Sequence, residues 1–426
     1  MSIVLFGSLI VLIAIGVPIA LSLSGATLVA LLTTTDVIPI VVTQRFFTAT
    51  DSFSLMAIPF FMMAGLLMEK GGISNRLINL ANLMLRNLHG GLAIVTIIVS
   101  AFFGALTGSS AATVAAVGGI LIPAMIKSGY DEGFALSTGA TAGYLGCIIP
   151  PSIPMITYGV ATGASIGALF MAGVVPGILL AVGMCLYAFW VGCKQGYKGS
   201  DQKASFREIL TAFADAIWAL LMPVIILGGI YGGFFTPTEA SCVALFYGLV
   251  VSIFIYKELK IKDLPAMIKQ AMVNSAMVMF IIAGAAAFGY LMTRGMIPTR
   301  IANAIIGLTN SPILFLLIVD IVLLIMGTFM ETNAAIMITA PIFLPIVKAM
   351  GIDVVHFGII MIVNLAIGQI TPPLGVNLFV AAGVHGGTIE KVVNKHLIWY
   401  LIVSIAILLL LTYIPGLVML LPNLLG

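Results

Sequence analysis

The chain has 426 residues, of which 61% are hydrophobic and 8% are charged, and its formal net charge is +3. Soluble domains carry about 25% charged residues. The composition therefore excludes a soluble globular protein and predicts an all-α integral membrane protein. The four cysteines lack metal-ligand spacing, and no glycine-rich run follows a strand pattern. These two patterns disfavour a metal centre and a nucleotide site.

The N-terminal apolar run, residues 3–32, predicts the first membrane helix. It has no basic segment in front of it and is too long for a signal peptide. Apolar runs long enough to span a bilayer, about 20 residues each, follow along the rest of the chain. Glycine or proline interrupts several others. We expect about ten to twelve spanning segments and two re-entrant ones.

Two polar loops in the middle of the chain are rich in basic residues. Two apolar helices, joined by a turn at residues 236–239, separate the loops, so both loops lie on one side of the membrane. The positive-inside rule predicts that this side is cytoplasmic. The basic residues are Lys194, Lys198, Lys203 and Arg207 in one loop, and Lys257, Lys260, Lys262 and Lys269 in the other.

One sequence pattern occurs twice. Residues 146–151 read Gly-Cys-Ile-Ile-Pro-Pro, and residues 368–373 read Gly-Gln-Ile-Thr-Pro-Pro. Further matches precede the motif in the same order in both halves, for example Gly104 with Gly327 and Pro123 with Pro345. Chance does not explain several ordered blocks, so we infer two homologous halves.

The repeat predicts four parts of the chain. An N-terminal scaffold helix and connection comes first, and a middle region with cytoplasmic loops and two scaffold helices separates the repeats. Each repeat contains a hairpin and a broken helix, and the second ends with a C-terminal helix. The boundaries are 1–50, 51–193 (hairpin about 100–125, broken helix about 134–165), 194–274, and 275–426 (hairpin about 323–347, broken helix about 355–384).

The paired prolines mark helix breaks inside apolar sequence. Pro-Pro removes two backbone donors and blocks the helical hydrogen bonds, and in lipid each freed carbonyl needs a partner. Broken helices at matching positions of two halves indicate the binding site of a transporter. The alternative is that both proline pairs are structural kinks only.

A polar segment of small residues precedes each break, at residues 104–113 and 327–336. Each lies within an apolar stretch of about 20–25 residues, which predicts a hairpin that enters the membrane and leaves on the same side. Its turn exposes carbonyls and helix N-termini, which is tolerable only inside protein or beside a water-filled cavity. The alternative is that the hydroxyl groups bond to carbonyls of their own helices.

The two breaks and two turns together predict cation and anion sites. Unwound carbonyls suit an alkali cation, and helix N-termini suit an anion. We therefore expect one cation site in each half, with a substrate site between them. The first cation set is Thr107, Gly108, Ser110, Gly146, Ile149 and Pro150, and the second is Gly327, Thr328, Thr332, Gly368, Thr371 and Pro372. The substrate set is Ser109, Ser110, Pro151, Ser152, Glu331, Thr332, Asn333 and Asn377.

Two acidic residues lie in apolar sequence. A carboxylate there is costly unless it is paired or wetted, so it is a candidate functional group. Glu331 could accept a hydrogen bond from a substrate hydroxyl or lie near a cation, and the alternative is a structural pair with a hairpin hydroxyl. For Asp320, a salt bridge to an arginine of another helix explains an acid in apolar sequence as well as a functional role does.

Several of these motifs resemble the large membrane subunit of tripartite ATP-independent periplasmic (TRAP) transporters, of the DctM type. The matching segments are residues 109–113 (Ser-Ser-Ala-Ala-Thr), 146–155, 172–177 and 370–379. The resemblance covers nearly the whole chain. It implies the elevator fold of the ion-transporter superfamily, in which a scaffold carries a mobile transport domain built from two inverted repeats.

The resemblance also implies a function. Members of this family are secondary transporters of the bacterial inner membrane that import organic acid anions, such as sialic acids, C4-dicarboxylates or sugar acids, with sodium ions. No organic cofactor is implied. The implied partners are a small membrane subunit (DctQ type) and a periplasmic substrate-binding protein (DctP type). The chain begins directly with the large subunit's first helix, so we expect no fused small subunit. Glu331 stands where the family more usually has aspartate.

Other functions are compatible with parts of the pattern. A sodium-coupled carboxylate transporter that works without a binding protein is the first alternative. An ion channel is the second, because selectivity filters also use irregular backbone. An enzyme is disfavoured, since no Ser-Lys, Asp-Asp or His-metal arrangement occurs at helical spacing.

Two amphipathic stretches, residues 73–88 and 297–308, fit arm helices that lie at the membrane surface. The alternative is that they are ordinary loop helices packed on the bundle.

Overall fold

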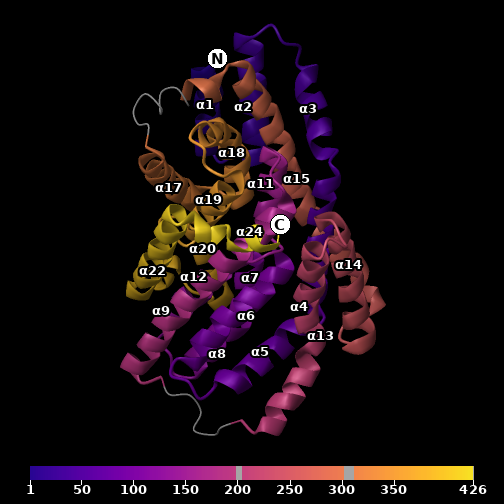
Figure 1. The fold of residues 1–426 in the computed structure, drawn as a ribbon, viewed down its shortest axis with the longest axis vertical. Helices are drawn as coiled ribbons and strands as arrows, with labels where there is room; N and C mark the ends of the chain where they lie inside the picture. Colours follow the sequence, from indigo (N-terminus) through magenta and orange to yellow (C-terminus); the bar gives the residue numbers. More distant parts are fainter. Residues whose placement is uncertain (198–203, 302–310, 426) are drawn as a thin grey trace.

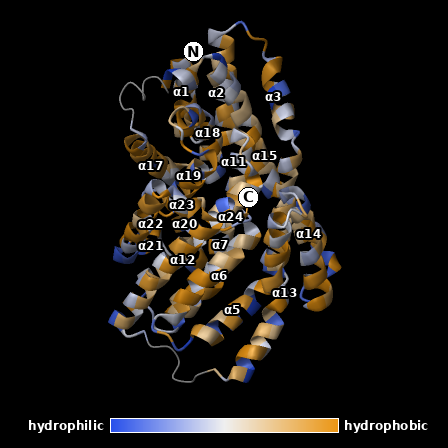
Figure 2. Ribbon diagram, viewed as in Figure 1, coloured by the Kyte–Doolittle hydropathy of each residue, from blue (hydrophilic) through white to orange (hydrophobic). Residues whose placement is uncertain are grey.

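The computed structural model describes residues 1–197, 204–301 and 311–425, and all regular structure within these ranges is helical (Figure 1). Nine helices in the described residues are long and apolar enough to cross a membrane. Hydrophobic residues cover most of their surfaces, and hydrophilic residues gather at helix ends and loops (Figure 2). The prediction of an all-α membrane protein is confirmed.

The N-terminal run forms two helices, so the prediction of a single one is wrong. Helix α1 (Ser2–Ala14) packs against α2 (Ile19–Thr34). The chain turns at Gly16, whose φ of +84° favours glycine. Pro18 then precedes α2 and cannot donate a helical hydrogen bond. Helix α3 (Ile40–Thr50) follows and has no buried residue.

The first half of the chain contains a helix, an arm helix, a hairpin, a broken helix and a long helix. A π-helical turn, η2, lies within the second arm of the hairpin. The elements are α4 (Ala57–Lys70), α5 (Ile73–Leu85), α6 (Gly91–Thr107), α7 (Ser110–Thr113), η2 (Val114–Gly118), α8 (Gly119–Lys127), α9 (Glu132–Gly143), α10 (Leu145–Ile148), α11 (Ile153–Thr162) and α12 (Ile166–Gln195).

The second half repeats this order after two linking helices. In Figure 1 the first hairpin extends toward the lower end of the molecule and the second toward the upper end, as expected for inverted repeats. The linking helices are α13 (Phe206–Tyr231) and α14 (Pro237–Val250). The second half consists of α15 (Leu264–Arg294), α17 (Pro312–Phe329), α18 (Thr332–Ala349), α19 (Val354–Gly368), α20 (Val376–His385), α21 (Ile389–Val392), α22 (Lys395–Tyr413), α23 (Pro415–Val418) and α24 (Leu420–Leu425).

Several boundaries differ from those predicted. The hairpins span residues 91–127 and 312–349, so both are longer than expected. The first arm of the first hairpin is one unbroken helix that ends at the tip, where Gly108 takes a left-handed φ of +61°. The boundary at residue 275 cuts through α15, a continuous helix of 31 residues.

The first predicted arm helix is packed on the bundle. Helix α5 contacts α6 and α13. Arg76 forms ion pairs with Asp215 (3.2 Å) and Glu258 (3.4 Å), and its guanidinium lies 3.8 Å from the ring centroid of Tyr256. In the second arm, residues 297–301 are helical, and the remainder of that prediction lies outside the described residues.

Candidate substrate and cation site

Both helices break at the paired prolines. Helix α10 ends at Ile148 and α11 begins at Ile153, with a bend of 41° between the two parts. Helix α19 ends at Gly368 and α20 begins at Val376. The peptide bonds between the prolines are cis in both breaks.

A pair of glycines joins each hairpin to the break of its own half. A Cβ added to Gly104 would lie 2.5 Å from the Cα of Gly146, and one added to Gly368 would lie 2.5 Å from the Cα of Gly327. Such distances leave no room for any side chain. The repeated glycines are therefore explained by a backbone crossing that occurs in both halves.

A backbone hydrogen bond supports the same contact. The N–H of Ile153 donates to the carbonyl of Gly108 (3.3 Å), and the N–H of Gly375 donates to the carbonyl of Thr328 (3.1 Å). Ile153 and Gly375 occupy matching positions after their prolines. Each hairpin tip is thus fixed to the start of the segment that follows the break.

Side-chain hydrogen bonds connect the tips to the opposite halves. Ser110 in the first tip donates to Oδ1 of Asn377 in α20 (2.8 Å). Asn333 in the second tip accepts at Oδ1 from the hydroxyl of Thr157 in α11 (2.9 Å). Ser110 and Asn333 occupy matching repeat positions. The tips and breaks therefore form one connected structure at the centre of the molecule.

A cavity of about 310 Å³ lies between this structure and helices α4 and α15. Five of the predicted residues line it: Gly108, Ser109, Ser110, Glu331 and Asn333. Eleven further lining residues lie outside the predicted sets, among them Met62, Cys147, Asn274, Met277 and Gln369. Two of these had a signal in the sequence, because Asn274 interrupts an apolar run and Gln369 is part of the repeated motif.

Four helices begin at the cavity, two from each half. They are α7, α11, α18 and α20, and residues of the first turn of each line the cavity. A helix N-terminus carries partial positive charge and unpaired N–H groups, which favour a bound anion. None of the described lining residues is lysine or arginine. Any attraction for an anion in this cavity would therefore come from neutral donors, namely backbone N–H groups and the hydroxyl and amide side chains of the lining.

Glu331 caps the N-terminus of α18. Its Oε2 accepts from the N–H groups of Asn333 (2.8 Å) and Ala334 (3.2 Å), and its Oε1 accepts from Nδ2 of Asn333 (2.7 Å). The structural pairing of Glu331 is thus with backbone and amide donors, and not with a hairpin hydroxyl. The cap also orients Asn333 toward Thr157. In the first half, Ser109 precedes α7 and makes no side-chain cap bond among the described residues.

Part of the first predicted cation set converges. The hydroxyl of Thr107 lies 3.3 Å from the hydroxyl of Thr113 and 3.4 Å from the carbonyl oxygen of Ser109. The hydroxyl of Thr113 donates to the same carbonyl (2.8 Å). A Cβ on Gly146 would lie 2.6 Å from the Thr113 hydroxyl oxygen. Thr113 lies within the first polar turn but outside the predicted cation set.

Other members of the first cation and substrate sets face elsewhere. The side chain of Ile149 packs against Gly177 of α12. Ser152 donates to the carbonyl of Cys147 and so bridges the break itself. Pro150 and Pro151 are buried within the break.

In the second predicted cation set, the side-chain hydroxyls are already engaged in hydrogen bonds. Thr328 donates to the carbonyl of Ile325 (2.7 Å), and Thr371 donates to that of Ile367 (3.0 Å), so these hydroxyls satisfy their own segments. Thr332 is fully buried and accepts a hydrogen bond from Nε2 of Gln369. The Oε1 of Gln369 is buried and has no hydrogen-bond partner among the described residues. Gln369 therefore offers an acceptor to a ligand in the cavity.

Asp320 is paired with polar neutral groups. It accepts from Nδ2 of Asn364 in α19 (2.6 Å) and from the hydroxyl of Thr412 in α22 (3.1 Å). Asn364 and Thr412 thus take the place of the arginine expected for a salt bridge. Asp320 therefore connects three helices outside the central cavity.

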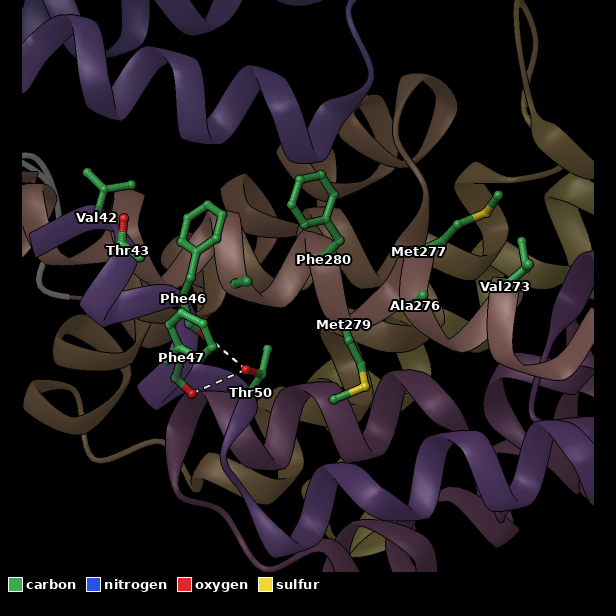
Figure 3. Close-up of a pocket in the computed structure, with 11 residues that line it drawn as sticks. Val42, Thr43, Phe46, Phe47, Thr50, Val273, Ala276, Met277, Met279 and Phe280 are labelled. Carbon is green, nitrogen blue, oxygen red and sulfur yellow. Dashed lines mark hydrogen bonds between the residues drawn. The ribbon is translucent and has the colours of Figure 1, made fainter. Parts of the chain in front are cut away.

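A larger hollow lies between α3 and α15 and is apolar. Its volume is about 880 Å³, and aromatic and methionine side chains such as Phe46, Phe280 and Met279 line it (Figure 3). The hydroxyl of Thr50 donates to the carbonyls of Phe46 (2.9 Å) and Phe47 (3.2 Å), its own helix. This groove therefore lacks the converging polar groups of a substrate site.

Comparisons with known proteins agree with this architecture. The family described as tripartite ATP-independent periplasmic transporter, DctM component, matches residues 6–417. The isethionate TRAP transporter permease protein DctMQ of Oleidesulfovibrio alaskensis is 47% identical over 98% of this chain, which spans 65% of that protein. The C4-dicarboxylate TRAP transporter large permease protein DctM of Rhodobacter capsulatus is 41% identical over 100% of this chain and 99% of that protein.

A solved structure shares the fold. The YdaH transporter of Alcanivorax borkumensis superposes with a TM-score of 0.63 at 16% identity, over 88% of this chain and 87% of that one. At this identity the likeness concerns the fold alone. The family match covers nearly the whole length, as do the two permease relatives. The chain therefore belongs to the DctM family of tripartite ATP-independent periplasmic transporters.

Proposed function

We propose that this chain is the large membrane subunit of a secondary transporter that imports a small organic acid anion. The observation that carries the proposal is the convergence of four helix N-termini, two from each half, on one cavity. Its volume of about 310 Å³ is at the small end of ligand pockets. The relatives named for isethionate and for C4-dicarboxylates suggest the same substrate class.

Sodium is the proposed coupling ion. Its support is the oxygen set around Thr107, Thr113 and the carbonyl of Ser109, which adjoins the break at Gly146. Alkali cations in transporters are held by unwound carbonyls and helix ends. A matching break in the second half supports a second ion, with Gln369 as an added acceptor.

The proposed movement is of the elevator type. Hydrogen bonds between the halves join both hairpins and both broken helices into one body. The opposite wall of the cavity comes from α4 and α15, through Met62 and Met277. Apart from Asn274, the residues of this wall are apolar, so few directional bonds would oppose sliding of the central body along it. A small membrane subunit and a periplasmic binding protein are the proposed partners, and the bacterial inner membrane is the proposed location.

Reconstitution tests the proposal. The chain is inserted into liposomes with its small subunit, and uptake of isethionate and of C4-dicarboxylates is measured with and without the binding protein. We expect saturable uptake that requires an inward sodium gradient and the binding protein. Equal uptake with a potassium gradient would refute sodium coupling. Full uptake without the binding protein would favour the simpler carboxylate transporter, and single-channel currents would favour a channel.

A charge substitution tests the cavity directly. Gln369→Glu places a negative charge beside the helix N-termini with little change in size, so anion affinity should fall by about tenfold or more. Gln270→Glu is the matched control, because Gln270 is exposed and hydrogen-bonds only to Lys70 among the described residues. Equal effects of the two substitutions would place the anion site elsewhere.

A further inference from the structure

A second polar cavity lies between α12 and α22, away from the hairpin tips. Its volume is about 250 Å³, and Lys194, Lys395, Trp190 and Trp399 are among its lining residues. None of the described lining residues is acidic. Asp131 is the acid that interacts with His396 of the lining, and its Oδ2 accepts the N–H of Phe134 (2.9 Å). The cavity therefore presents positive charge that no described lining residue neutralises.

His396 gives this cavity an unused buried polar atom. The residue is 4% exposed and lines the cavity, and its Nδ1 lies 2.9 Å from the hydroxyl of Tyr187. Its Nε2 is buried and has no hydrogen-bond partner among the described residues. Buried polar atoms are almost always paired. If Tyr187 donates to Nδ1, then Nε2 carries the proton and can donate to a ligand oxygen.

An apolar groove continues from the polar cavity along the same two helices. Its volume is about 540 Å³, and it shares Tyr187, Trp190 and Trp399 with the cavity. Gly183 and Ile407 line it further along α12 and α22. At 1.5 Å per residue, these positions lie roughly 16–18 Å from the lysines. This length is close to half of the hydrocarbon thickness of a bilayer, about 15 Å.

We propose that this cavity and groove together bind one membrane phospholipid with an anionic headgroup. The phosphate contacts Lys194, Lys395 and the Nε2–H of His396, and an acyl chain lies in the groove. Exposed Trp190 and Trp399 each lie four residues, about one helical turn, from Lys194 and Lys395, and tryptophan is enriched at membrane interfaces. Basic residues beside membrane helices attract anionic lipids. The apolar groove favours a lipid over a soluble phosphate, which needs no such surface.

The proposed lipid would connect the two repeats. Helix α12 belongs to the first half and α22 to the second, and the cavity lies between them. The lipid site is independent of the substrate site, because the two cavities share no lining residue. Failure of the lipid test would therefore leave the proposed transport function unaffected.

Tryptophan quenching tests the site. The chain has three tryptophans, and Trp218 in α13 lies outside the site. In a Trp218→Phe background, the full chain in detergent is titrated with phosphatidylglycerol that carries brominated acyl chains. We expect saturable quenching that brominated phosphatidylcholine reproduces only at much higher concentration. Equal quenching by both lipids would overturn the anionic headgroup.

Two double variants complete the design. Replacing Lys194 and Lys395 by glutamine should raise the lipid concentration for half-maximal quenching by about tenfold to thirtyfold. The control replaces Lys262 and Lys269, which are exposed and distant in sequence, and should cause no shift. Equal shifts in both would show unspecific attraction and refute the site. Release of the lipid by inorganic phosphate at similar concentration would assign the cavity to a soluble anion instead.

Discussion

Replacing Glu331 by glutamine tests how the tip of the second hairpin is held. The carboxylate accepts two backbone N–H groups at the start of α18 and one amide N–H of Asn333. Glutamine keeps the size but has one oxygen, so it can face only one of these donor sets. Its NH₂ group then faces the other donor set and cannot accept a hydrogen bond from it. The charge-assisted bonds are lost and one bond disappears.

The size of the effect follows from these three hydrogen bonds. A hydrogen bond to a charged group contributes about 1.5–3 kcal/mol, and one between neutral groups about 0.5–1.5 kcal/mol. Weakening two bonds and losing a third should lower the free energy of unfolding by about 3.5–6 kcal/mol. Substrate affinity should fall as well, because the cap orients Asn333 in the cavity wall.

Thermal denaturation and substrate binding are measured on the same detergent preparation of the variant. The matched control is Glu390→Gln, since Glu390 is exposed in the short helix α21. We expect a lower melting temperature for Glu331→Gln and an unchanged melting temperature for the control. An unchanged melting temperature together with a tenfold loss of affinity would refute the capping role. A lower melting temperature with unchanged affinity would remove Glu331 from the substrate site.

Three other substitutions test the packing around the site. Gly104→Ala should lower the free energy of unfolding by about 1–3 kcal/mol or more and so lower the melting temperature, because the added Cβ would lie 2.5 Å from the backbone of Gly146. The control is Gly289→Ala, because an added Cβ at Gly289 has no atom within 4 Å. A double-mutant cycle of Ser110→Ala and Asn377→Ala should give a coupling energy of about 1 kcal/mol in stability, and strict additivity would contradict the bond between the halves. Asp320→Ala should destabilise by about 1–3 kcal/mol by leaving buried donors unpaired, and an unchanged unfolding midpoint would argue against this.

The sequence alone determined the class of protein, its repeat and the place of both helix breaks. Sparse charge in a long apolar chain is compatible only with a membrane environment, because charged groups are costly in lipid. The two Gly-x-x-x-Pro-Pro segments located both helix breaks, because proline removes the backbone donor that a helix needs. These features are local, so they can be read from neighbouring residues without knowledge of the fold.

Helix boundaries were predicted less well. The apolar run at residues 3–32 predicts one helix, whereas Gly16 and Pro18 divide it into two. The hairpins begin earlier than predicted, because their apolar first arms extend back to residues 91 and 312. Hydropathy measures transfer into lipid and does not mark where a helix turns.

Only the tertiary structure decided which polar groups share the cavity and which serve the fold. Gln369 and Asn274 come from segments far apart in sequence and lie on one cavity wall only because the helices pack. Ser110 and Asn333 are bonded across the two halves, a pairing that no local pattern contains. Thr328 and Thr371 fit the same sequence criteria but bond to their own segments. A hydroxyl's role depends on the nearest acceptor, and in a bundle of inverted repeats that acceptor often comes from the other half of the chain.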